Sequence, residues 1–151
     1  MKLVFLLCGL FALNIASAEQ PYTFFDEKNA QAFEGKAVIR TEKGWMYVGD
    51  MKDGKPHGNG VKISDNGVVL YGQWVNGDLE GNGATYTPAP FSALEAGKYK
   101  RNKVVGEGVI VMGEEVYQGP YGSLGLPDGE GLCTKNAVER PCTYSNGEKI
   151  Q

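Results

Sequence analysis

"LYGQWVNGDLEGNG" occupies residues 70–83, and "YVGDMKDGKPHGNG" occupies residues 47–60. The two stretches share four glycines at equivalent places, 23 residues apart, while most residues between them differ. A fixed glycine set among changing neighbours indicates an internal repeat whose backbone is constrained more than its side chains. The matched pairs are Gly49 and Gly72, Gly54 and Gly77, Gly58 and Gly81, and Gly60 and Gly83.

Two further stretches follow the same pattern. "EAGKYKRNKVVGEG" spans residues 95–108, with Asn102 at the place of the second glycine, and "YQGPYGSLGLPDGEG" spans residues 117–131, with one residue inserted in its turn. Four copies at nearly constant spacing predict an array of stacked structural units. The glycines predicted to be structural in these two copies are Gly97, Gly106, Gly108, Gly119, Gly129 and Gly131.

Each copy has the pattern of a β-hairpin. In its first arm Leu70, Gly72 and Trp74 alternate with other residues at period two, as on one face of a strand. In its second arm apolar residues follow the closing glycine at the first and third places, as Val61 and Ile63 do. Segments rich in Gly, Asn, Asp and Pro join the arms and favour turns. We therefore expect an all-β fold, an elongated antiparallel single-sheet meander of repeated hairpins.

The glycines are expected to serve two purposes. Those in turns would adopt a positive φ, which costs glycine little. Gly72 falls inside a strand, where a glycine normally weakens the structure. We expect an aromatic ring of the adjoining strand to lie across its bare backbone.

The repeats resemble the MORN (membrane occupation and recognition nexus) family. Its pattern is approximately Y-x-G-x-[W/F/Y]-x-x-G-x-x-x-G-x-G, with Leu70 and Met51 replacing aromatics here. The resemblance covers about residues 45–131, and it implies an elongated single sheet that acts as an interaction or assembly module. The predicted copies lie near 45–67, 68–92, 93–115 and 116–131, with a partial copy at 33–44.

The remaining segments complete the predicted organisation. A lysine, an apolar run and the small residues Ala16-Ser17-Ala18 indicate a signal peptide over residues 1–18, cleaved after Ala18, and hence a secreted or periplasmic protein. Residues 19–34 would form an N-terminal flank or cap, 35–131 the repeats and 132–151 a C-terminal cap. Cys133 and Cys142, the cysteines that remain, are expected to form one disulfide.

Charge and motif content restrict the function. Removal of the leader takes away Lys2 and no acid, so the net charge becomes −4, which argues against nucleic acid as a partner. We predict no metal and no cofactor, because His57 is the sole histidine and the acidic segments lack calcium-loop spacing. We also predict no catalytic residues, and assign His57 and the turn carboxylates to solvated turns.

The aromatic residues are the predicted binding surface. A one-layer sheet leaves rings uncovered, and rows of exposed rings mark binding sites. We expect a non-enzymatic module that binds a protein or peptide, through Tyr47, Trp74, Tyr99 and Tyr121. Three alternatives remain open at this stage: a small secreted hydrolase that uses an acid pair, a lipid- or glycan-surface binder, and a homodimer formed through sheet edges.

Overall fold

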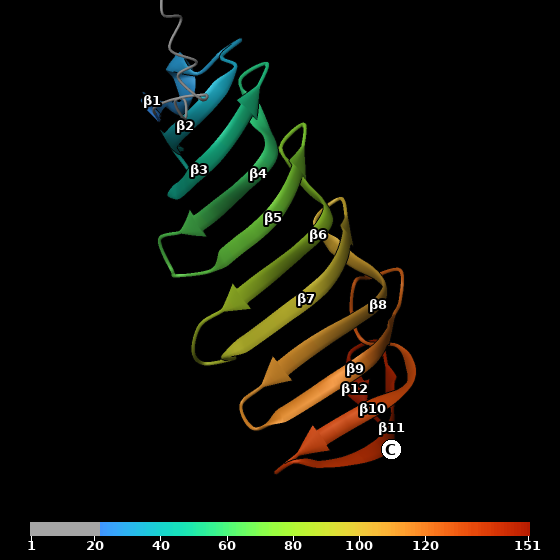
Figure 1. Cartoon of the computed structure of the whole chain (residues 1–151). Coiled ribbons are helices and arrows are strands. Elements are labelled where there is room, and N and C mark those ends of the chain that lie inside the picture. The colour runs from blue at the N-terminus through green and yellow to red at the C-terminus, as the bar shows by residue number, and fades with distance from the viewer. Residues whose placement is uncertain (1–21) are drawn as a thin grey trace, which may run out of the picture.

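The computed structural model describes residues 22–151, and the predicted leader lies outside them. Within this range one sheet of twelve strands follows the order of the chain, so the predicted all-β meander of hairpins is confirmed (Figure 1). Every neighbouring pair is antiparallel except β1 and β2, which run parallel. The strands are β1 Thr23–Asp26, β2 Gly35–Arg40, β3 Trp45–Lys52, β4 Lys55–Ser64, β5 Val69–Val75, β6 Asp78–Thr87, β7 Ala93–Lys100, β8 Lys103–Met112, β9 Glu115–Tyr121, β10 Gly129–Lys135, β11 Val138–Ser145 and β12 Glu148–Lys149, with the single 3₁₀ turn η1 at Glu27–Asn29.

A row of glycines crosses the middle of the sheet on the face that we name the inner face. Directly paired residues of neighbouring strands lie on the same face, and glycine pairs with glycine from β3 to β9. A Cβ atom built on Gly119 would come 3.0 Å from the Cα atom of Gly131, so the row continues onto β10. Its members are Gly49, Gly60, Gly72, Gly83, Gly97, Gly108, Gly119 and Gly131.

The repeat contains a second kind of strand glycine, just beyond this row. The register shifts there in the β3–β4, β5–β6 and β7–β8 hairpins, so the second strand carries extra residues. Gly58, Gly81 and Gly106 lie among these extra residues with φ values of +61°, +85° and +72°. Glycine adopts this backbone at little cost, and such bulges bend a strand. These three hairpins therefore bend toward the inner face at their tips.

Hydrogen bonds join the bent tips of successive hairpins. The amide of Gly77 donates to the carbonyl of Pro56 at 2.9 Å, while that of Gly54, in the first tip, donates to Phe33 in the segment before β2 at 3.1 Å. Asn102, which replaces a turn glycine, has a φ of +64°, and its amide donates to the carbonyl of Leu79 at 3.1 Å. The tips consequently form a second layer over the sheet, and a core lies between the two layers.

The core rings lie against the glycine row, but not at the glycine where we expected one. A Cβ atom on Gly72 would come 2.5 Å from the carbonyl oxygen of Asn82 and 3.2 Å from Leu79 Cδ1, so strand backbone and a leucine approach it instead of an aromatic ring. Tyrosine rings lie over other glycines of the row. A Cβ atom on Gly60 would come 2.5 Å from Tyr47 Cζ. The absence of a side chain thus makes room for a ring one strand away from the predicted place.

Short segments cover the two edges of the sheet. At the N-terminal edge β1 pairs with β2, and Phe25 packs on Phe33 with ring centroids 4.7 Å apart. At the other edge β11 and the two-residue strand β12 follow β10. The predicted Cys133–Cys142 disulfide joins β10 to β11 across a Cα separation of 5.8 Å. It fastens the C-terminal strands to the array.

Loss of this disulfide is expected to destabilise the protein by about 2–3 kcal/mol, because the bond restricts the unfolded chain over a loop of nine residues. Urea unfolding with and without reductant would measure the difference. The Cys133→Ala/Cys142→Ala double variant is the control, since reductant should leave its midpoint unchanged. A wild-type midpoint that reductant does not move would contradict the expected contribution.

Candidate functional site

The four predicted binding aromatics are buried. Tyr47 and Tyr99 are each 2% exposed, Trp74 is 1% exposed and Tyr121 is 7% exposed. The prediction that these rings form an exposed surface is therefore wrong. The bent hairpin tips, which a single-layer sheet lacks, cover them from the side opposite the sheet.

The polar atoms of three of these rings have hydrogen-bond partners, whereas the buried Tyr121 Oη has none among the described residues. Tyr47 Oη donates to the carbonyl of Asp50 at 2.8 Å, and Trp74 Nε1 donates to that of Gly60 at 3.0 Å. The Tyr47 and Trp74 rings meet edge to face with centroids 5.6 Å apart. Tyr99 Oη donates to Thr85 at 3.0 Å, and burial raises the pKa of Tyr99 to about 12. These contacts assign the four rings to the core.

The opposite face of the sheet, the outer face, carries two rows of apolar side chains. We name this surface the outer ribbon. Each row runs through direct pairs from β2 to β11, and the residues of the two rows lie two apart along every strand. The first row is Val38, Val48, Val61, Tyr71, Ala84, Ala96, Val109, Gln118, Leu132 and Pro141; the second is Arg40, Met46, Ile63, Val69, Tyr86, Leu94, Val111, Val116, Thr134 and Glu139.

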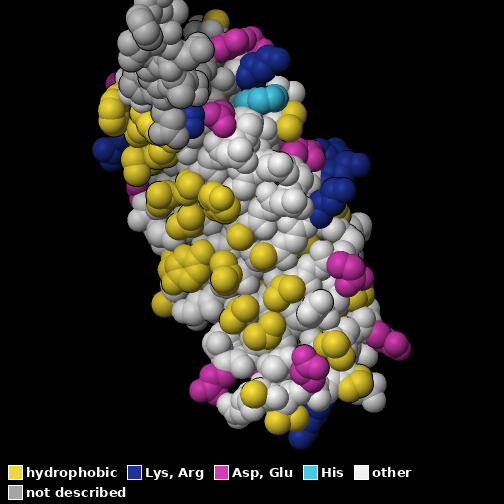
Figure 2. Space-filling view, viewed as in Figure 1, with side chains coloured by type: hydrophobic (Ala, Val, Ile, Leu, Met, Phe, Trp, Pro, Cys, Tyr) yellow, Lys and Arg dark blue, Asp and Glu magenta, His cyan; other side chains and the backbone are white. Residues whose placement is uncertain are grey.

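The outer ribbon is open to solvent. Tyr71 is 61% exposed, Leu94 is 45% exposed and Tyr86 is 44% exposed. Figure 2 views the molecule from this side and shows hydrophobic side chains gathered in a band along the hairpins, with most charged side chains at its margins. Monomeric proteins seldom expose a continuous apolar surface of this extent, and such surfaces mark interaction sites.

Sequence reasoning used the residues of the ribbon but missed its role. The first and third places after each closing glycine, occupied by Ala84 and Tyr86 in the second copy, were assigned only to strand periodicity. Apolar residues occupy both places in the first three copies, and this recurrence was a sufficient signal for a continuous row. It could not show which face of the sheet is covered.

The residues considered for chemistry lie apart from this face. His57 is half-buried in β4, and its carbonyl lies 3.4 Å from Tyr47 Oη. Glu115 forms ion pairs with Lys149 at 3.6 Å and Lys135 at 3.9 Å. Within residues 22–151 no three His, Cys, Asp or Glu side chains gather as metal ligands do. In the same range no helix is long and apolar enough to cross a membrane.

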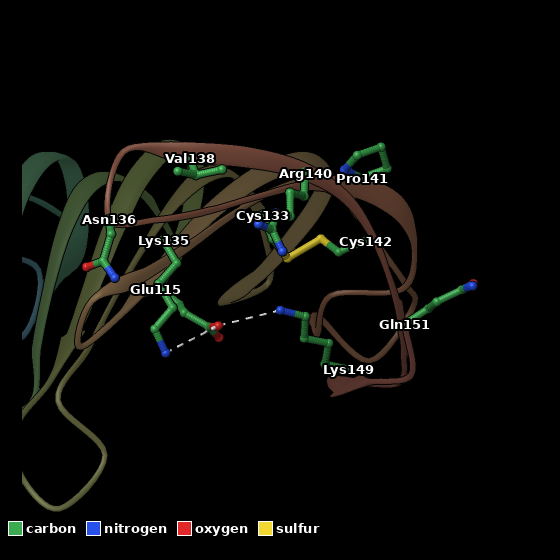
Figure 3. A pocket seen from close by; sticks show the side chains of 10 residues that line it. All are labelled: Glu115, Cys133, Lys135, Asn136, Val138, Arg140, Pro141, Cys142, Lys149 and Gln151. Atoms are coloured by element: carbon green, nitrogen blue, oxygen red, sulfur yellow. Dashed lines mark ion pairs between the residues drawn. A yellow bond between two sulfur atoms is a disulfide. The ribbon is translucent and has the colours of Figure 1, made fainter.

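A hollow of about 420 Å³ lies beside the disulfide at the C-terminal end of the array (Figure 3). Cys133 and Cys142 border it together with the Glu115 ion pairs, and the last residue, Gln151, lines one side. The Gln151 carbonyl accepts from the amide of Thr143 at 3.1 Å, which holds the chain end near this hollow.

Two segments of the chain match the model of a known family. Residues 47–69 and 71–86 match the MORN repeat. These two segments are similar to MORN repeats. They cover the β3–β4 hairpin and most of β5–β6. No curated protein matches the chain.

MORN repeats are generally associated with scaffold roles in which they bind proteins or membranes, and the family is typically non-catalytic. The Cys133–Cys142 disulfide is of the kind that persists in oxidising compartments. The general role thus agrees with an open apolar face, while the disulfide agrees with a location outside the reducing cytosol.

Proposed function

We propose that this chain is an exported, non-enzymatic scaffold that binds protein through its outer ribbon. The outer ribbon is the observation that supports the proposal. Its rows cross ten strands, and the charged residues in these rows are Arg40 and Glu139, one at each end. Ridges of Tyr, Leu and Met at low charge supply the contact area that protein interfaces use. The predicted leader and the disulfide support export.

The hairpins β7–β8 and β9–β10 are, in this proposal, two diverged copies of the same repeat. They continue the glycine row through Gly97, Gly108 and Gly119. They also continue both apolar rows of the ribbon, as Leu94 and Val111 do. The binding face then extends beyond the segments that match the family model.

Site-specific photocrosslinking tests the contact surface. A photoreactive phenylalanine analogue at position 71, on the ribbon, is expected to form covalent adducts with protein in the native compartment. The same analogue at Leu124 is the matched control, because Leu124 is 58% exposed but lies in the β9–β10 turn, off the ribbon. Equal adduct yields at both positions, or none at position 71, would contradict the proposed binding face.

Export is checked on the same material. The protein recovered from the native compartment is expected to begin at Glu19, and its mass should be two hydrogens below that of the dithiol form. Recovery of the chain in the cytosol with its leader attached would refute export. The crosslinking at position 71 tests the binding face separately.

A further inference from the structure

The charge along the second row of the outer ribbon is asymmetric. Arg40 on β2 begins this row and Glu139 on β11 ends it, and the eight residues between them carry no charge. The first row is uncharged throughout its length from Val38 to Pro141. Asp26 neighbours Arg40 on β1, and no ion pair within residues 22–151 joins the two.

This pattern is complementary to itself when reversed. A two-fold axis parallel to the strands and lying between two outer faces would place β2 of one copy over β11 of the other, and β6 over β7. The same axis places each row of the ribbon over its own counterpart. Arg40 then faces Glu139 of the second copy at both ends, and Tyr86 faces Leu94 at the centre.

The dimensions of the ribbon agree with a stable interface. Ten strands spaced about 4.8 Å apart give a length of about 48 Å. Two rows, with the polar residues that border them, occupy roughly 20 Å across the strands. The footprint of roughly 900 Å² per copy matches the roughly 800 Å² per partner of a standard interface. Twisted sheets pack face to face in this aligned manner, about 10 Å apart.

We infer that the occupant of the outer ribbon is a second copy of this chain, packed face to face with its array direction reversed. This inference rests on the proposed function and names its partner. Such an interface is isologous, so every contact occurs twice and a single substitution acts twice. Pairing of exposed sheet edges is not part of it.

Sedimentation velocity of the purified protein tests the dimer. We expect the wild type to sediment with the mass of two chains at micromolar concentration. Leu94→Glu places two charges at the centre of the interface and is expected to weaken association by about 100-fold or more, because an unpaired buried charge is costly. Leu124→Glu is the matched control and should remain dimeric. Circular dichroism checks that both variants are folded.

Charge exchange tests the reversed order. Arg40→Glu and Glu139→Arg should each weaken the dimer by about three- to ten-fold, since each places like charges opposite one another at both ends. The double variant should recover the wild-type affinity. Lys43→Glu, a charge reversal in the β2–β3 turn, is the control and should have no effect. Failure of the double variant to recover affinity would overturn the reversed arrangement.

The outcomes separate the two proposals. A wild type that stays monomeric, while position 71 still crosslinks to another protein, overturns the second copy as occupant and leaves the scaffold function standing. A dimer that Leu94→Glu does not weaken overturns the ribbon as its interface. If the wild type stays monomeric and position 71 yields no adduct, the outer ribbon is not a binding face.

Discussion

Gly72→Ala is expected to lower the free energy of unfolding by about 3 kcal/mol or more, whereas Gly77→Ala in the same hairpin should lower it by about 1–2 kcal/mol. Both glycines have a positive φ, +147° at Gly72 and +94° at Gly77, so both substitutions strain the backbone. They differ in their surroundings. A Cβ atom on Gly72 would come 2.6 Å from Gly83 Cα, while nothing lies within 4 Å of one on Gly77.

The free energy of unfolding that Gly72→Ala loses beyond the loss in Gly77→Ala therefore measures the close approach of β5 and β6. Backbone cannot move aside as a flexible side chain can, so the sheet must deform along the glycine row. Urea unfolding of the two variants beside the wild type gives the comparison. Equal losses would mean that the backbone strain at a positive φ accounts for the whole effect at Gly72, and that the close approach of β5 and β6 contributes nothing.

Unfolding above pH 10 is the second large effect that we expect. Burial raises the pKa of five tyrosines, Tyr47, Tyr99, Tyr117, Tyr121 and Tyr144, and that of Tyr99 reaches about 12. In the unfolded chain these phenols titrate near their ordinary pKa of about 10. Above that pH the unfolded state binds fewer protons than the folded state, so stability falls as pH rises. Each such tyrosine contributes a slope of up to about 1.4 kcal/mol per pH unit.

Urea midpoints measured at pH 9, 10 and 11 would show the slope, and phenolate absorbance would rise together with unfolding. Tyr99→Phe should flatten the slope because it removes one titrating group, although it also removes the hydrogen bond to Thr85. Stability that stays constant over this pH range would contradict the burial of the rings.

Much of the fold follows from glycine spacing and period-two alternation. The alternation of Leu70, Gly72 and Trp74 placed these residues on one face of a strand, and the register of β5 with its neighbours confirms it. The disulfide followed from the count of cysteines. These features depend on local geometry and on neighbours in the array, which one repeat already contains.

The identity of the covered face could not be predicted in the same way. Alternation separates two faces but does not say which of them acquires a second layer. That layer depends on Gly58 and its counterparts, whose positive φ bends the tips. In the sequence these glycines resemble turn glycines, so the alternation alone does not indicate the bend, and it predicts an exposed Trp74 where the structure has a buried one. The candidate site consequently lay on the opposite side of the same strands.

The strand order has a consequence for how the protein forms. Because strands pair in the order in which they occur in the chain, each hairpin can join the array as soon as it is synthesised, without waiting for a distant segment. The loops that must close are short, so the entropic cost of each addition is small. The two ends of the sheet differ in how firmly their terminal strands are attached. The disulfide ties β10 to β11 at the last end to be made, while at the other end of the described residues the four-residue strand β1 covers β2. Fraying of the native array should therefore begin where synthesis began.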